Sequence, residues 1–213
     1  MNEAEFISLV GEQKILALVR APSAESGLRA AEAAIVGGIK LIEVALSTPG
    51  AFRIISDLRR QYGDRASVGA ASVIAYDQID RAVKSGAQFI SMPHTVSSMI
   101  ETCRKHRAPA IIGALTPTEV VAASSLGAAF IAIWPASALG GPDYLAKLTS
   151  EMPNIRLGVA GGVSPENIFD YVTAGAFAIT VGRSLFTRGD LENENYAAIA
   201  ERARGMLRLA GVA

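Results

Sequence analysis

Eight short apolar segments alternate with amphipathic stretches along most of the chain, and this alternation restricts the possible folds more than any other feature. Glycine or proline separates many of the segments. Repeated βα units of this kind build a sheet of parallel strands with helices packed on it. The predicted strands are residues 14–20, 40–46, 66–71, 88–93, 109–115, 129–135, 155–160 and 177–182.

The predicted helices are marked at both ends. Several end in a glycine that suits a left-handed cap, and Thr116-Pro117 and Ser164-Pro165 have the residue types of a helix start. Eight such units in 213 residues favour a single (β/α)8 TIM barrel over 1–213, with an extra N-terminal helix beneath the barrel and a last helix at 193–209. A doubly wound open sheet is the alternative, but it usually has fewer strands and a glycine motif after the first. The cap glycines are Gly38, Gly86, Gly127 and Gly175.

The charges argue for a small-molecule partner or for self-association. Lysine plus arginine number 20 and so do aspartate plus glutamate, so we expect no attraction to nucleic acid or to membranes. An acidic N-terminus and the lack of an apolar run of roughly 18 residues predict neither a signal peptide nor a membrane span. Cys103 is the single cysteine, which excludes an intramolecular disulfide and fits a reducing, cytoplasmic setting.

Strand alternation predicts a polar cavity inside the barrel. If Ile42 and Val44 face the helices, Glu43 points inward, and Arg20 ends the inner face of the first strand. A carboxylate inside a barrel costs several kcal/mol unless it is partnered or hydrated. Because barrel enzymes keep their sites at the carboxyl ends of the strands, this pair indicates a site there. An ion pair between Glu43 and Arg20 that merely closes the barrel is the alternative.

Glycines at two consecutive strand ends predict a phosphate site. Gly161 and Gly162 follow the seventh strand, and Gly182, Arg183 and Ser184 follow the eighth. Glycines let the backbone approach a phosphate, and free amides donate to it. The alternative is that these glycines only form tight turns.

With these residues considered, the chain resembles the family of 2-keto-3-deoxy-6-phosphogluconate and 2-keto-3-deoxy-6-phosphogalactonate aldolases, which includes 4-hydroxy-2-oxoglutarate aldolases. The resemblance covers nearly the whole chain, through segments such as "KILALVRAPS", "GGIKLIEVALSTP", "SGAQFISMPH" and "GVAGGVSPENI"; "LSTP" and "WPASALGGPDYL" are nearer to the phosphogalactonate branch. It implies a homotrimer without a cofactor. It also implies a class I carbon–carbon lyase, in which a lysine forms a Schiff base with a phosphorylated keto acid and pyruvate and glyceraldehyde 3-phosphate are released.

The resemblance also implies roles for individual residues. Glu43 matches the proton-shuttling glutamate and Arg20 the arginine of the first strand, while Gly161, Gly162, Gly182 and Ser184 match the phosphate cradle. Substrate contacts are expected at Ser72, His94 and Pro135. Arg183 is a charge added beside the phosphate loop.

The family lysine has no counterpart, because Ala132 occupies its position three residues before Pro135. Other departures are Ala71, Ala160 and Ser47. No other lysine is expected at the barrel mouth, and Glu43 with His94 makes a poor metal site because three ligands are usual. Three functions therefore stay open: a lyase whose lysine was replaced, a drifted barrel that binds a phosphosugar or 2-oxo acid, and a trimeric scaffold without chemistry.

Overall fold

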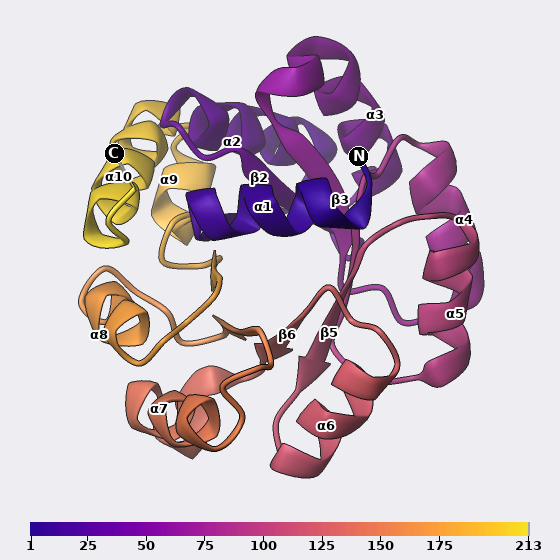
Figure 1. The fold of residues 1–213 in the computed structure, drawn as a ribbon. Coiled ribbons are helices and arrows are strands. Elements are labelled where there is room, and N and C mark those ends of the chain that lie inside the picture. Colours follow the sequence, from indigo (N-terminus) through magenta and orange to yellow (C-terminus); the bar gives the residue numbers. More distant parts are fainter. Residues whose placement is uncertain (213) are drawn as a thin grey trace.

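The computed structural model describes residues 1–212 and shows a closed barrel of eight parallel strands arranged in chain order, with β8 pairing back to β1 (Figure 1). Every strand lies within a segment predicted as a strand, so the barrel is confirmed and the open sheet was wrong. The strands are β1 (Ile15–Val19), β2 (Leu41–Ala45), β3 (Ser67–Ala71), β4 (Ile90–Met92), β5 (Ala110–Ala114), β6 (Phe130–Ile133), β7 (Leu157–Ala160) and β8 (Ile179–Val181).

Helices surround the barrel (Figure 1). The predicted glycine caps are confirmed, because all four glycines have φ between 86° and 101°. Among residues 1–212, no helix has the length and apolar character needed to cross a membrane. The helices are α1 (Glu3–Gln13), α2 (Ala24–Val36), α3 (Ala51–Tyr62), α4 (Tyr76–Lys84), α5 (Ser97–Lys105), α6 (Pro117–Ser125), α7 (Pro142–Glu151), α8 (Ile168–Thr173), α9 (Arg188–Glu192) and α10 (Tyr196–Leu209), with 3₁₀ turns η1 (Gly63–Arg65) and η2 (Ala136–Leu139).

The two predicted helix starts had different outcomes. Thr116 caps α6 and Pro117 is its first residue, as predicted. By contrast, α8 begins only at Ile168 with Asn167 as its cap, so the helix start at Ser164-Pro165 was wrong. The reason is that the Asn167 side chain accepts a hydrogen bond from the Ser164 amide at 2.9 Å, which holds the preceding residues in a turn.

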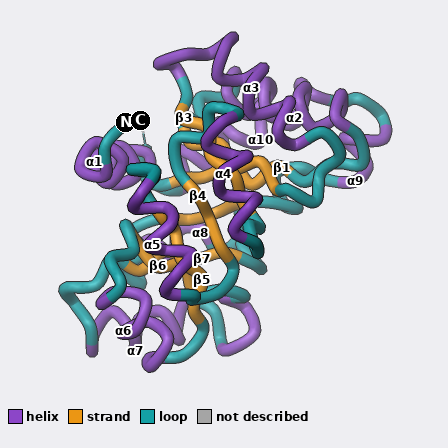
Figure 2. The backbone as a smooth tube through the Cα atoms, turned by 90° about the vertical axis from the view of Figure 1, so that its right-hand side faces the viewer, coloured by secondary structure: helices purple, strands orange, loops and turns teal. Residues whose placement is uncertain are grey.

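Helix α1 covers the amino-terminal end of the barrel, as predicted (Figures 1 and 2). Its Phe6 side chain is fully buried and stacks on Phe89, with ring centroids 4.8 Å apart, and on Phe130 at 6.4 Å. Val10 joins the same apolar cluster inside the barrel. This plug closes one end, so a cavity inside the barrel can open at the other.

The strand faces follow the predicted alternation. Ile42 and Val44 belong to the larger apolar cluster between strands and helices, whereas Leu41 belongs to the cluster inside the barrel. Glu43 therefore lies on the inner face of β2, in register with Leu18 of β1 and Gly69 of β3.

Candidate active site

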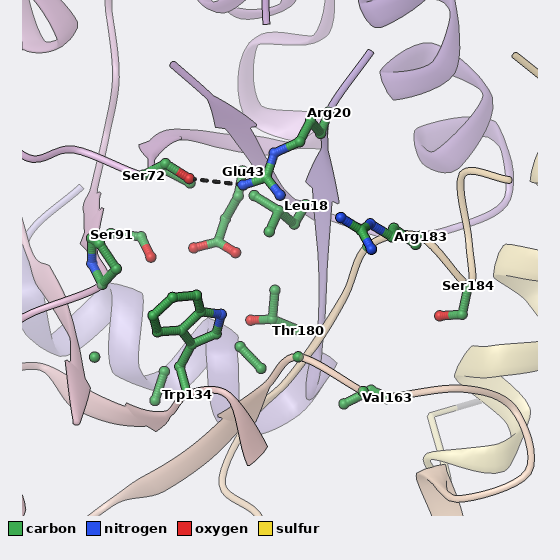
Figure 3. A pocket seen from close by; sticks show the side chains of 18 of the residues that line it. Leu18, Arg20, Glu43, Ser72, Ser91, Trp134, Val163, Thr180, Arg183 and Ser184 are labelled. Atoms are coloured by element: carbon green, nitrogen blue, oxygen red, sulfur yellow. Dashed lines mark hydrogen bonds between the residues drawn. The ribbon is translucent and has the colours of Figure 1, made fainter. Parts of the chain in front are cut away.

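A cavity of about 620 Å³ opens at the carboxyl ends of the strands, where the sequence predicted a site (Figure 3). Most of the predicted site residues line it. They are Arg20, Glu43, Ser72, Ala132, Gly161, Gly162, Gly182, Arg183 and Ser184.

Glu43 is the acidic side chain of this cavity. Only 2% of it is exposed, and its carboxylate points into the space between Ser91, Thr180 and Trp134 (Figure 3). Burial raises the pKa of Glu43 to about 7, although the hydroxyls of Ser91 and Thr180 oppose this change. The carboxyl group can therefore accept or release a proton near neutral pH, as a general acid–base catalyst must.

Arg20 is held at the mouth by serines rather than by a carboxylate. Its Nε donates to Ser47 Oγ at 3.2 Å and its guanidinium to Ser72 Oγ at 3.1 Å. No ion pair joins Arg20 to Glu43 among the described residues, so the alternative of a simple closing pair was wrong. The Arg20 guanidinium therefore remains available for an anionic ligand. Ser72, which accepts its hydrogen bond, has a left-handed backbone conformation with φ of 59°.

The loop after β7 requires its two glycines. Gly161 and Gly162 have φ of 82° and 83°, and a Cβ on Gly162 would collide with the Ser137 side chain. A Cβ on Gly161 would lie 3.2 Å from Pro135. Pro135 thus packs against this loop but is not among the residues that line the cavity.

Asn167 holds the same loop and was missed by the sequence reasoning. Besides accepting from Ser164, it donates through Nδ2 to the carbonyl of Gly162 at 2.9 Å. The amides of Gly162 and Val163 donate to no acceptor within residues 1–212. They are therefore free to bind an anion. An asparagine shortly after a glycine pair is the signal that could have revealed this clamp.

The loop after β8 also lines the cavity, through Gly182, Arg183 and Ser184. The amides of Leu185 and Phe186 both donate to the Gly182 carbonyl, at 3.0 and 2.9 Å, which folds residues 182–186 into a turn. Within the described chain, the Arg183 and Ser184 amides have no acceptor and the buried Ser184 Oγ has no partner. Donors and a guanidinium beside the glycine loop suit a phosphate group.

Ala132 lies on the inner face of β6 and lines the cavity with 7% of its side chain exposed. Its register partners are Gly113 on β5 and Gly158 on β7, so small residues surround the position at which the resemblance predicts a lysine. No lysine is among the residues that line the cavity. The site therefore offers no lysine amine with which a ligand could form a covalent imine.

Trp134 is a further residue at the mouth of the cavity. It is the single tryptophan of the chain, it lines the cavity mouth and it is 47% exposed. Ser91 and Thr180 were missed as partners of Glu43. The signal for both was their inward parity at the carboxyl ends of the fourth and eighth strands.

His94 follows β4 and is not among the residues that line the cavity; its Nδ1 is buried without a hydrogen-bond partner in the described chain. Within residues 1–212 no three His, Cys, Asp or Glu side chains are grouped to hold a metal ion.

Comparisons with known proteins agree with this geometry. The model of the KDPG and KHG aldolase family matches residues 6–202. The 2-dehydro-3-deoxy-6-phosphogalactonate aldolase of Escherichia coli K12 is 30% identical over 176 residues, which cover 82% of this chain and 85% of that protein.

Solved structures are also similar to this chain in sequence and in fold. One described as "Native KDPGal structure" is 28% identical, with a TM-score of 0.83 over 92% of this chain and 93% of the other. A porous protein cage designed by fusing symmetric oligomeric domains is 27% identical, with a TM-score of 0.84 over 93% of this chain and 72% of the other.

Proposed function

The chain belongs to the KDPG and KHG aldolase family, and from this premise we propose that it binds a small phosphorylated 2-oxo acid without forming a Schiff base. The observation that carries the proposal is the composition of the cavity. It combines backbone amides without acceptors and an arginine after β7 and β8, a buried carboxyl group, and an alanine at position 132. The protein is thus equipped to bind and to move a proton, but not to form a covalent intermediate through a lysine.

In this proposal the phosphate lies against the loops after β7 and β8. The free amides of Gly162, Val163 and Ser184 donate to its oxygens, and Arg183 adds a positive charge. Arg20 faces the carboxylate of the ligand, because its guanidinium lies at the mouth and is oriented by Ser47 and Ser72. The ligand is therefore held through two anionic groups of its own, the phosphate and the carboxylate.

Glu43 then contacts the carbon next to the ketone or the hydroxyl beyond it. With a pKa near 7 it removes a proton from one position and returns it to another. Without an imine as electron sink, the carbanion is stabilised only by the ketone oxygen and its surroundings. We therefore expect slow enolisation of the bound 2-oxo acid rather than efficient carbon–carbon cleavage.

Ligand binding can be measured through Trp134, because it is the only tryptophan and it lines the cavity. We expect its fluorescence to change saturably with 2-keto-3-deoxy-6-phosphogluconate or with the galactonate epimer. Inorganic phosphate should compete, and pyruvate alone should bind more weakly. If phosphorylated and unphosphorylated acids bind equally, the phosphate site is wrong.

The Arg183→Ala variant tests the cradle further. Arg183 is exposed and forms no ion pair among the described residues, so its removal should leave the fold intact. Removing one charge-assisted contact to the phosphate should weaken phosphorylated ligands about tenfold and leave pyruvate unaffected. An equal loss for both ligands would show that Arg183 does not bind the phosphate.

A homotrimer and a cytoplasmic location complete the proposal. The trimer is supported by the resemblance to the aldolase family and by the similarity to a cage that was built from symmetric oligomeric domains. The cytoplasmic location is supported by the single cysteine, Cys103, which is buried. Light scattering after size-exclusion chromatography tests the trimer, and a monomer at micromolar concentration would contradict it.

A further inference from the structure

The carboxyl group of Glu43 has an unused acceptor. Glu43 is only 2% exposed, and its buried Oε1 atom has no hydrogen-bond partner among residues 1–212. An unpaired buried acceptor is destabilising, so such atoms are normally satisfied by protein, water or ligand. This oxygen faces a cavity, and a ligand that enters can supply the missing donor.

Part of the wall of the same cavity is lined by small residues. These residues are Gly113 on β5, Ala132 on β6 and Ala160 on β7. Nothing larger than a methyl group projects from these positions. A group on a ligand can therefore reach the carboxylate without displacing a side chain.

Among the described residues, Glu43 has hydroxyl groups beside it and no ion-pair partner. Ser91 and Thr180 present hydroxyl oxygens on either side of the carboxylate (Figure 3). Arg20 is turned toward Ser47 and Ser72 instead. Within residues 1–212, the buried carboxylate therefore has no cationic partner.

We propose that this end of the cavity is a subsite for a primary ammonium group, held by Glu43 together with Ser91 and Thr180. A primary ammonium is a compact group with three donors, which matches one carboxylate oxygen and two hydroxyl oxygens. A guanidinium is planar and larger, and a quaternary ammonium has no donor. The subsite lies in the cavity of the proposed function and rests on phosphate binding at the cradle for its second anchor.

The ammonium can come from two sources. It is either an amino group of the phosphorylated ligand itself, or a small free amine that binds beside a phosphorylated 2-oxo acid. In both cases Glu43 must be ionised. The other titratable groups that line the cavity are Arg20 and Arg183. Amine affinity should therefore increase as the pH rises through the range in which Glu43 ionises, and then level off.

The first experiment uses glucosamine 6-phosphate and glucose 6-phosphate, which differ only by an amino group in place of a hydroxyl. Their affinities are measured at pH 8 by calorimetry and by Trp134 fluorescence. We expect the amino sugar to bind at least about tenfold more tightly to the wild type. The isosteric Glu43→Gln variant should bind the two with equal affinity.

The second experiment uses methylammonium, which does not depend on the length of a phosphorylated ligand. Methylammonium alone should raise the unfolding temperature of the wild type but not that of Glu43→Gln, and tetramethylammonium at the same ionic strength should do neither. It should also increase the affinity for 2-keto-3-deoxy-6-phosphogluconate severalfold if a free amine is the natural occupant.

The outcomes separate the two proposals. A preference for the amino sugar without a methylammonium effect on keto-acid binding assigns the amine to the ligand, and the reverse assigns it to a free amine. If neither amine prefers the wild type over Glu43→Gln, the ammonium subsite is wrong, even where phosphorylated compounds bind. If the amines bind and no phosphorylated acid does, the subsite stands and the proposed function fails.

Discussion

Replacing Ala132 with lysine should convert the cavity into one capable of covalent chemistry. The position is on the inner face of β6, in register with Gly113 and Gly158, so the new side chain has room to extend toward Glu43. Burying the ammonium costs several kcal/mol. Its attraction to the ionised Glu43, at a separation of ~4 Å and an effective dielectric constant of ~20, returns about 4 kcal/mol. We expect a net change in stability of less than about 2 kcal/mol.

The gain should be in activity. With an amine in place, a bound keto acid can form an imine, and Glu43 can then transfer protons to and from it. General acid–base catalysis alone contributes about 10²–10⁴-fold. Because Glu43 is already present in the wild type and only the amine is added, we expect the low end of this range, about 100-fold over the wild type.

The assay couples pyruvate release to lactate dehydrogenase, with 2-keto-3-deoxy-6-phosphogluconate and its galactonate epimer tested in parallel. The Ala132→Met variant is the matched control, because it adds a chain of similar length without an amine. If Ala132→Lys is folded, with an unfolding midpoint close to that of the wild type, and releases no more pyruvate than Ala132→Met, the cavity has changed beyond the loss of one amine. That result would refute the reasoning.

Three further predictions concern stability. The pKa of Glu43 is about 7 in the folded chain against an ordinary 4.5, so its ionisation destabilises the fold as the pH rises between these values. The free energy of unfolding of Glu43→Gln should therefore exceed that of the wild type by about 3 kcal/mol at pH 8 and equal it at pH 4. Urea unfolding at both pH values measures this, and a pH-independent gain would contradict it. Gly162→Ala should lower the free energy of unfolding by about 1–3 kcal/mol, because the φ of Gly162 is 83° and a Cβ there would collide with Ser137. The control Gly205→Ala in α10 should raise it by up to about 1 kcal/mol. Thermal unfolding compares the two variants, and equal effects would be inconsistent with backbone strain at Gly162. Phe6→Ala should cost about 3–5 kcal/mol in urea unfolding, since it removes the plug of the barrel, and a loss below about 1 kcal/mol would mean that α1 is dispensable.

The sequence was sufficient to predict where the main residues of the barrel lie. Alternation along 40–46 placed Glu43 inside, and glycines were expected at the ends of two neighbouring strands where they line the cavity, because strand parity and left-handed φ are local properties. The barrel itself followed from repeated βα units.

Contacts between distant segments were not predictable in the same way. Arg20 was weighed as a partner of Glu43, yet it bonds to Ser47 and Ser72, 27 and 52 residues away, and such pairing depends on rotamers that sequence does not reveal. His94 follows a strand end but does not line the cavity. The start of α8 was wrong because the side chain of Asn167 competes with the helix for backbone groups.

The most direct test of the account is the mass of the wild-type chain after incubation with a phosphorylated keto acid and sodium borohydride. Trp134 fluorescence first establishes that the ligand is bound under these conditions. Ala132→Lys serves as the positive control for a reduced imine. We predict that the wild type binds the ligand and keeps its unmodified mass, because no lysine lines the cavity. A mass increase equal to a reduced pyruvate or keto-acid adduct would contradict the account.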